Sequence, residues 1–370
     1  MSSQRTTSTV TLQTIADRCG VTKVTVSRAL NGNLQHVNKA TMERIKTVAS
    51  ELGYNPGANH DARRLAMRKG TQPILNHTVG FLLSERFYET NYYQTLLQGA
   101  LEVLAPKHYG LLLGYMYQNI QLADLPYAFR RDQLDAILTC RPESEMKPLL
   151  KELFVQRNFT RRPMVSMVYR IPGCSSVIPD HQMAGYLLAR HLILQGHRHM
   201  LHFAPDDFPL LHPLDLRLAG YRQAYREAGL NPDLYLEYMP YPYSQQLQCD
   251  DLYSYAREVL NKLDKCAKIT AVLAPYDKFA GILIEILSKH GRRVPEDISV
   301  VGLDNTDPVL NQHGENILTT IQMPLIEIGR QAAGLALRQI SHEESENVTV
   351  LLPVKLVERA STCPPRSVQT

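Results

Sequence analysis

The chain has 370 residues, 44% of them hydrophobic, which is enough for two or three domains with buried cores. No run of about 18 apolar residues occurs, which argues against a membrane span. The first residues, MSSQRTTSTVTL, lack the basic start and apolar core of a secretory signal, so we expect a cytoplasmic protein. The six cysteines are scattered without a CxxC pair, a pattern typical of reduced thiols.

Positive charge is concentrated near the N-terminus. The formal net charge is only +4, yet residues 1–70 hold eleven Lys and Arg against four Asp and Glu, and the rest hold 29 against 32. A basic segment on a nearly neutral body is expected of a module that binds polyphosphate. The other interpretation of the charge alone is a solvated basic tail.

The basic segment has the apolar periodicity of three short helices. Their predicted N-caps are Thr11, Thr22 and Asn38, and the first helix is expected to end at Gly20. Only residues 19–21 separate the first two helices, which is too short for an antiparallel hairpin. This is helix-turn-helix spacing, in which the second helix can lie in a major groove.

The second predicted helix presents a polar, basic side with Lys23, Thr25, Ser27 and Arg28. Hydroxyl groups suit phosphate oxygens, and the planar fork of Arg suits guanine O6 and N7. The pattern therefore predicts a DNA-binding module. A three-helix packing domain without DNA contact is the alternative.

The rest of the chain alternates short apolar strands with helical stretches. Examples are the predicted strands at 77–83, 109–116 and 298–304 and the predicted helices at 92–105 and 183–197. Repeated units of this kind indicate parallel sheets with helices on both faces. Ligands of such sheets bind at the carboxyl ends of the strands.

The sequence of the basic segment resembles the headpiece of the lactose-repressor (LacI/GalR-type) family. The similar string is TLQTIADRCGVTKVTVSRALNG…HVNKATMERIKTVASELGYNP, against the family pattern TxxDIAxxAGVSxxTVSRxLN…VSxxTRxRVxxAxxxLGYxPN. The strings VPEDISVVGLDN and LPVKLVERAST extend the resemblance over nearly the whole chain. It implies an all-α helix-turn-helix headpiece plus an α/β periplasmic-binding-protein-like core of two doubly wound subdomains.

The resemblance also implies a division into three segments. They are a DNA-binding headpiece over 1–56, a hinge helix and linker over 57–76, and an effector-binding and dimerisation core over 77–370. The core is expected to form two lobes of discontinuous sequence: one of about 77–178 and 323–350, the other of about 179–322 and 351–363.

In that family, the second helix and its neighbours contact DNA. The matching residues imply base contacts from Lys23, Val24 and Arg28. The residues matched to phosphate contacts are Thr25, Ser27, Asn31, His36, Asn38 and Thr41, with Tyr54 packed near the DNA backbone. The sequence departs from the family pattern at Thr14, where Asp is usual, and at Asn38, where Ser is usual.

Residues 57–70 resemble the family's hinge segment, PNxxARxL. In relatives this segment folds into a short helix on DNA and inserts a leucine into the minor groove, and Leu65 matches that position. Gly57 stands where Asn is usual, and the spacing from Pro56 to Ala62 is two residues longer than in the family. A plain basic linker is the alternative.

The resemblance places a small effector between the two lobes. The residues that it assigns there are Arg217, Asp304, Tyr276, Asp277, Phe87, Tyr92 and Met323. Arg217 and Asp304 would form a polar clamp that suits a polyhydroxylated ligand, and a structural ion pair is the alternative. Tyr276 stands where Asn is usual, which would add a stacking face and remove an amide that hydrogen-bonds sugars.

The implied function is an allosteric repressor, with operator affinity set by a sugar or sugar derivative. It would act at the nucleoid as a homodimer on a near-palindromic double-stranded DNA operator. Alternatively, the core responds to a protein partner or to a nucleoside or purine. No leucine heptads follow residue 360, which favours a dimer over a tetramer.

An enzyme or a transport protein finds little support in the sequence. No GxGxxG or GxxxxGK[ST] string and no nucleophile–base constellation occurs, so we expect no cofactor. His197, His199 and His202 could suggest a metal site, but on a strand His202 would face away from the other two. We therefore expect no metal there.

Overall fold

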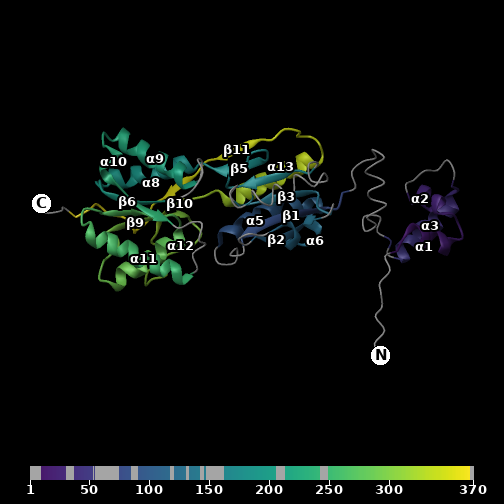
Figure 1. Ribbon diagram of the computed structural model, residues 1–370, viewed down its shortest axis with the longest axis horizontal. Coiled ribbons are helices and arrows are strands. Elements are labelled where there is room, and N and C mark those ends of the chain that lie inside the picture. The colour runs from purple at the N-terminus through teal and green to yellow at the C-terminus, as the bar shows by residue number, and fades with distance from the viewer. Residues whose placement is uncertain are drawn as a thin grey trace, which may run out of the picture. The chain divides into compact units, whose positions relative to one another are not determined.

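The structure is a computed structural model of the chain (Figure 1). It describes residues 10–30, 37–52, 54, 75–84, 91–116, 121–130, 133–141, 146, 162–205, 213–241 and 249–366. The chain divides into two compact units, Met1–Asn76 and His77–Thr370.

The described part of the first unit consists of α1 (Leu12–Cys19), α2 (Lys23–Leu30) and α3 (Lys39–Glu51). The Thr11 hydroxyl accepts the N–H of Thr14 at 3.3 Å, and the Thr14 hydroxyl accepts the N–H of Thr11 at 3.2 Å. Two orphan N–H groups are thus satisfied reciprocally, and Thr14 closes this box where the family has Asp. At its other end α1 stops at Gly20, whose φ of 59° is left-handed.

The other two helices begin at the predicted caps. Thr22 Oγ1 accepts the N–H of Thr25 at 3.2 Å, and Asn38 Oδ1 accepts the N–H of Thr41 at 2.8 Å. The three helices enclose a small apolar core made of Ile15, Ala16, Cys19, Val26, Ala29, Val37, Met42, Ile45 and Ala49. The predicted helix-turn-helix headpiece is confirmed.

The second unit contains two sheets, the first of which has the strand order β11-β5-β4-β3-β1-β2 with all neighbours parallel. Its strands are β1 (Thr78–Ser84), β2 (Gly110–Met116), β3 (Ala136–Thr139), β4 (Met164–Met167), β5 (Ser175–Pro179) and β11 (Thr349–Leu352). β3 and β4 are buried along their whole length, as expected of central strands covered on both faces.

The second sheet has the order β12-β10-β9-β8-β6-β7, in which only the β10–β12 pair is antiparallel. Its strands are β6 (Met200–Pro205), β7 (Leu236–Tyr241), β8 (Ala271–Leu273), β9 (Ser299–Asp304), β10 (Thr319–Gln322) and β12 (Lys355–Val357). Two sheets of this topology confirm the predicted doubly wound α/β core.

Helices cover both sheets. The long ones are α5 (Asn91–Leu104), α8 (His181–Leu194), α9 (Pro213–Glu227), α11 (Cys249–Lys265), α12 (Asp277–Lys289) and α13 (Leu325–Ile340). The short ones are η4 (Ala105–Lys107), η5 (Leu122–Asp124), α6 (Tyr127–Arg130) and α10 (Pro232–Tyr235). Figure 1 shows α8 and α9 on one face of the second sheet and α11 and α12 on the other. No helix within the described ranges is long and apolar enough to cross a bilayer.

The chain crosses between the sheets three times: after β5, after β10 and after β11. The third crossing lies two residues later in the chain than the predicted lobe boundary between residues 350 and 351, because β11 stays paired with β5 through Leu352. The parallel pairing satisfies the backbone of these two extra residues. The ends of the two sheets therefore meet beside the three crossing segments.

Candidate nucleic-acid interface and ligand cleft

One side of α2 is open to solvent. Lys23 and Arg28 are exposed, and Val24 has 56% of its surface exposed, whereas Val26 and Ala29 are buried in the headpiece core. An exposed valine between two cationic side chains can contact a thymine methyl group while the cations reach guanine or phosphate. The helix therefore has the composition of a surface that reads base edges.

The predicted phosphate contacts that the structure describes flank this surface. Thr25 and Ser27 are half-buried on α2, and Asn38 is exposed at the start of α3. Because Asn38 Oδ1 serves as the cap, its NH2 group remains as the donor for a phosphate oxygen. Thr41, half-buried, lies one turn into the same helix.

Tyr54 closes the headpiece core. Its backbone N–H donates to the Ala49 carbonyl at 2.8 Å, its ring packs against the apolar core, and burial raises the pKa of its phenol. Asn31, His36, Leu65 and Phe87 lie outside the described residues.

In the second unit, a cavity of about 380 Å³ lies where the two sheets meet. Its lining consists of Asn91, Thr95, Asp304, Asn305, Thr306, Gln322, Met323, Pro324, Leu325, Ile326, Glu327 and Arg330. The first two belong to α5 beside the first sheet, and the turn after β9 belongs to the second sheet. Asn91 Nδ2 donates to the Thr306 carbonyl at 3.2 Å, so one hydrogen bond joins the two lobes at the cavity.

Asp304 ends β9 and lines this cavity in an unusual backbone conformation. Its φ is 107°, and Asn305 follows with φ of 56°. Burial and the nearby Asp277 carboxylate raise the pKa of Asp304, whereas Arg217 lowers it. The carboxyl group therefore sits in a poorly hydrated place with a cation near it.

Arg217 is 7% exposed on α9 and approaches from the second lobe. Its Nη1 donates to the Pro275 carbonyl at 2.6 Å, and its buried Nε has no hydrogen-bond partner within the part of the chain that is described. No ion pair between Arg217 and Asp304 occurs among the described residues. A buried N–H without a partner is costly, which suits a donor that a ligand satisfies.

Asp277 holds the turn from behind. It is 2% exposed, its Oδ1 accepts the Thr320 hydroxyl at 2.5 Å, and its Oδ2 accepts the N–H of Thr306 at 3.2 Å. A Cβ on Gly302 would lie 2.2 Å from Asp277 Oδ1, so only glycine leaves room for it. Burial raises the pKa of Asp277 to about 7. The side chain is not part of the cavity lining and supports the turn instead.

Tyr276 lies next to this group but outside the cavity lining. Its hydroxyl hydrogen-bonds the Tyr241 hydroxyl at 2.7 Å, and its ring is 6.4 Å from that of Phe279. Tyr92 packs against the core of the first lobe, with its ring edge-on to Tyr93 at 5.3 Å. Neither ring contributes to the cavity described here.

Comparison with known proteins identifies the family. Residues 11–57 match the sequence family "Bacterial regulatory proteins, lacI family", and residues 189–362 match "Periplasmic binding protein-like domain". The HTH-type transcriptional regulator CelR of Thermobifida fusca is 30% identical over 358 residues, which span 95% of this chain and 98% of that protein. The chain belongs to the lacI family.

Further relatives agree with this membership. The HTH-type transcriptional repressor CytR of Escherichia coli K12 is 29% identical over 367 residues, 98% of this chain and 99% of that protein. The structure of a CelR–cellobiose complex matches with a TM-score of 0.61 and 27% identity, over 95% of this chain and 99% of that one. A LacI family regulator from Enterococcus faecium with bound ribose matches with a TM-score of 0.63 and 26% identity, over 78% of this chain and 100% of that one.

This lacI-family chain is therefore a DNA-binding transcription regulator, and its relatives are regulators rather than enzymes. Of the residues that the resemblance assigned to the effector, Asp304 and Met323 line the cavity. Arg217, Tyr276 and Asp277 do not belong to its lining, and Asp277 contacts it through the N–H of Thr306.

Several residues that line the cavity were not predicted from the sequence. Asn91, Thr95, Asn305 and Thr306 follow the ends of β1 and β9, where ligands of parallel sheets are expected. Their position after a strand end could have marked them as candidate ligand residues. That position could not show that α5 of one lobe meets the turn after β9 of the other lobe.

The three neighbouring histidines serve separate purposes. His197 contacts Thr270 Oγ1 at 2.8 Å and the Cys363 carbonyl at 2.9 Å. The ring of His199 packs on Tyr235, and that of His202 lies between Tyr221 and Tyr238. No group of three or more His, Cys, Asp or Glu able to hold a metal occurs in the described ranges.

Proposed function

We propose that this chain is a repressor that binds a near-palindromic operator as a homodimer. In this proposal, a neutral sugar or sugar derivative bound in the cavity sets the affinity for the operator. The observation that carries the proposal is the polar cavity at the Asp304–Thr306 turn, where the Asn91–Thr306 hydrogen bond joins the two lobes. A ligand that contacts both lobes there changes their relative energy.

The lining of the cavity supports a neutral, hydroxyl-rich ligand. Asp304 and Glu327 supply carboxylates, and Asn91, Asn305 and Gln322 supply amides that both donate and accept. Arg330 also lines the cavity, but its guanidinium pairs with Glu102 at 2.6 Å. Arg330 also pairs with Glu327 at 3.4 Å, so its charge is already matched by two carboxylates. This pairing disfavours an anionic ligand such as a sugar phosphate, whereas hydroxyl groups can donate to Asp304.

The same lining favours a sugar over a nucleoside or purine. Among the described residues that line the cavity, none is aromatic, so a flat base has no stacking partner there. CelR was solved with cellobiose, and the Enterococcus faecium regulator was solved with ribose. We propose that Arg217 Nε, Asp304 and Met323 contact the ligand, with Asp277 and Tyr276 as supports.

On the DNA side, we propose base contacts from Lys23, Val24 and Arg28. The proposed phosphate contacts are Thr25, Ser27, Asn31, His36, Asn38 and Thr41, with Tyr54 as a packing residue and Leu65 as the minor-groove wedge. The proposed segments are 1–56, 57–76 and 77–370. Because operator binding requires chromosomal DNA, we also propose that the protein acts in the cytoplasm, at the nucleoid.

A thermal-shift screen of the full chain tests the effector. The panel contains cellobiose, D-ribose, other neutral sugars, sugar phosphates, nucleosides and purines. A ligand at 100 times its Kd stabilises the fold by about 2.7 kcal/mol, which gives a clear shift. We expect a neutral sugar to shift the wild type and not Asp304→Asn. A shift from purines alone would contradict the proposal. The proposal would also be contradicted if no compound shifts the melting temperature and a protein from a cell lysate alters operator binding instead.

A further inference from the structure

The turn that carries Asp304 has a backbone that must be held in place. Asp304 and Asn305 have consecutive positive φ angles of 107° and 56°. Positive φ angles are uncommon for residues other than glycine, although Asn and Asp adopt them more readily than the rest, and they persist where surrounding contacts impose them. The position of the Asp304 carboxyl group therefore depends on what holds Asn305.

Arg359 supplies the contact that holds Asn305. Its Nη2 donates to Asn305 Oδ1 at 2.9 Å, and its Nη1 donates to the Leu318 carbonyl at 2.6 Å. The two bonds use the rigid fork of one guanidinium, so the Asn305 side chain is fixed relative to the strand that begins at Thr319. Arg359 does not line the cavity itself.

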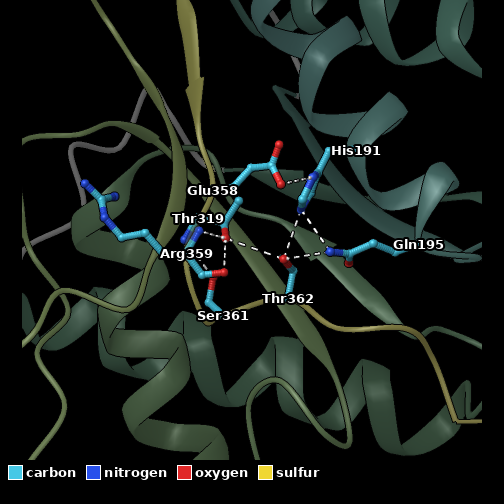
Figure 2. A network of polar contacts seen from close by, with 7 residues as sticks. All are labelled: His191, Gln195, Thr319, Glu358, Arg359, Ser361 and Thr362. Carbon is cyan, nitrogen blue, oxygen red and sulfur yellow. Dashed lines mark hydrogen bonds and ion pairs between the residues drawn. The ribbon is translucent and has the colours of Figure 1, made fainter.

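Arg359 is in turn fixed by the polar network of Figure 2. The Thr319 hydroxyl donates to the Arg359 carbonyl at 3.0 Å and accepts the Arg359 N–H at 2.9 Å. Three residues on, Thr362 Oγ1 lies 2.9 Å from His191 Nε2 of α8 and accepts from Nε2 of Gln195, the C-cap of α8, at 3.3 Å. The backbone of residues 358–362 is thus bound to β10 and α8.

We propose that Arg359 is a positioning residue of the effector site. By holding Asn305 in the left-handed conformation, it keeps the Asp304 carboxyl group in the cavity and keeps the Thr306 carbonyl in reach of Asn91. Asp277 holds the same turn through the Thr306 N–H. The claim about the effector rests on the proposed function, whereas the claim about the turn does not.

A purely structural role for Arg359, as a donor to the Leu318 carbonyl, makes a different prediction. If Arg359 acts by holding Asn305, then glycine at position 305, which adopts positive φ without cost, should make Arg359 unnecessary. If Arg359 only satisfies Leu318, then Asn305→Gly cannot compensate for its loss. The double variant therefore separates the two roles.

The first measurement is hydrogen exchange of the full chain without any ligand, on peptides covering residues 303–307. We expect Arg359→Ala to lose protection at the Thr306 amide, Asn305→Gly to keep it, and the double variant to regain it. Arg359→Lys should behave like Arg359→Ala, because an ammonium lacks the fork. Arg366→Ala, whose exposed side chain pairs with Asp297 at 2.9 Å, is the control and should match the wild type.

The second measurement is calorimetry with cellobiose and D-ribose. For the sugar that binds, we expect Arg359→Ala to weaken affinity about tenfold and the double variant to recover most of it. The proposal would be overturned if the Thr306 amide kept its protection in Arg359→Ala. It would also be overturned if that amide exchanged as fast in the double variant as in Arg359→Ala, and neither result depends on which sugar binds. An unchanged affinity of Asp304→Asn would instead refute the proposed effector site and leave the exchange result standing.

Discussion

Lys23, Val24 and Arg28 have little to do with the stability of the headpiece. All three are exposed on α2, while Val26 and Ala29 of the same helix fill the core. Substitution of the exposed residues should therefore change recognition without unfolding the domain. The structure separates exposed residues from core residues within a single helix of eight residues.

Arg28→Ala is expected to relax operator selectivity by about 1–3 kcal/mol, because it removes the bidentate base contact proposed for Arg28. The measurement is competition between an operator selected from random duplexes and non-specific DNA of equal length. Lys46→Ala is the control, since it removes the same charge from an exposed position of α3. An equal loss of selectivity in the control would mean that charge alone explains the effect.

His197 makes the stability of the core depend on pH. Burial lowers the pKa of His197 from 6.5 to about 4, so the folded chain holds a neutral imidazole in a range where the unfolded chain binds a proton. The free energy of unfolding should therefore fall as pH drops from 6.5 toward 4, and this contribution is fully present above 6.5. His197→Gln should show a shallower acid slope in denaturant titrations at fixed pH values. An unchanged slope would show that His197 does not titrate as described.

Among the elements, the α8–α9 pair sets the position of Arg217. A Cβ on Gly185 would lie 2.2 Å from the Arg217 carbonyl oxygen, and a Cβ on Gly220 would lie 2.0 Å from the Gln182 carbonyl oxygen. Neither backbone can move aside cheaply. The close approach of the two helices thus fixes the position of the Arg217 backbone relative to α8.

Gly185→Ala should destabilise the core by about 1–3 kcal/mol, because the helices must move apart. Gly334→Ala is the matched control: its Cβ would meet only the end of the Arg338 side chain, at 3.5 Å. In a helix, this change should be neutral or stabilising by about 0.5–1 kcal/mol. Urea titration compares the two, and equal effects would show that the α8–α9 approach is not tight in solution.

The elements were largely predictable from the sequence, because caps and periodicity are local. The predicted caps Thr11, Thr22 and Asn38 are the observed ones. β7 ends at Pro240 and Tyr241, and an edge strand tolerates proline.

The ligand cavity was only partly predictable. Asp304 and Met323 came from the family pattern, and both line it. Arg359 lies in the family-like string LPVKLVERAST, but neither its role nor that of Asn91 was predictable, because these roles depend on contacts to residues 54 and 215 positions away in sequence. Sequence periodicity reports which side of an element is buried and not which distant element covers it.

At the scale of the whole core, one turn joins the chemistry of the cavity to the arrangement of the lobes. Residues 304–306 carry the carboxylate, accept the hydrogen bond of Asn91 from the other lobe, and rest on Asp277 and Arg359. A sugar that bonds both sides of this turn favours one arrangement of the lobes. Its effect on DNA binding is limited by the difference in its affinity for the two arrangements.

Operator affinity with and without the sugar tests the central claim most directly. Fluorescence anisotropy of a labelled operator, selected from random duplexes, gives the Kd of the wild type and of Asp304→Asn at fixed salt. We predict that the neutral sugar found by thermal shift changes the wild-type Kd by about 5- to 150-fold, and that Asp304→Asn loses this response. A wild-type Kd that no neutral sugar changes, or an Asp304→Asn variant that responds as the wild type does, would contradict the account.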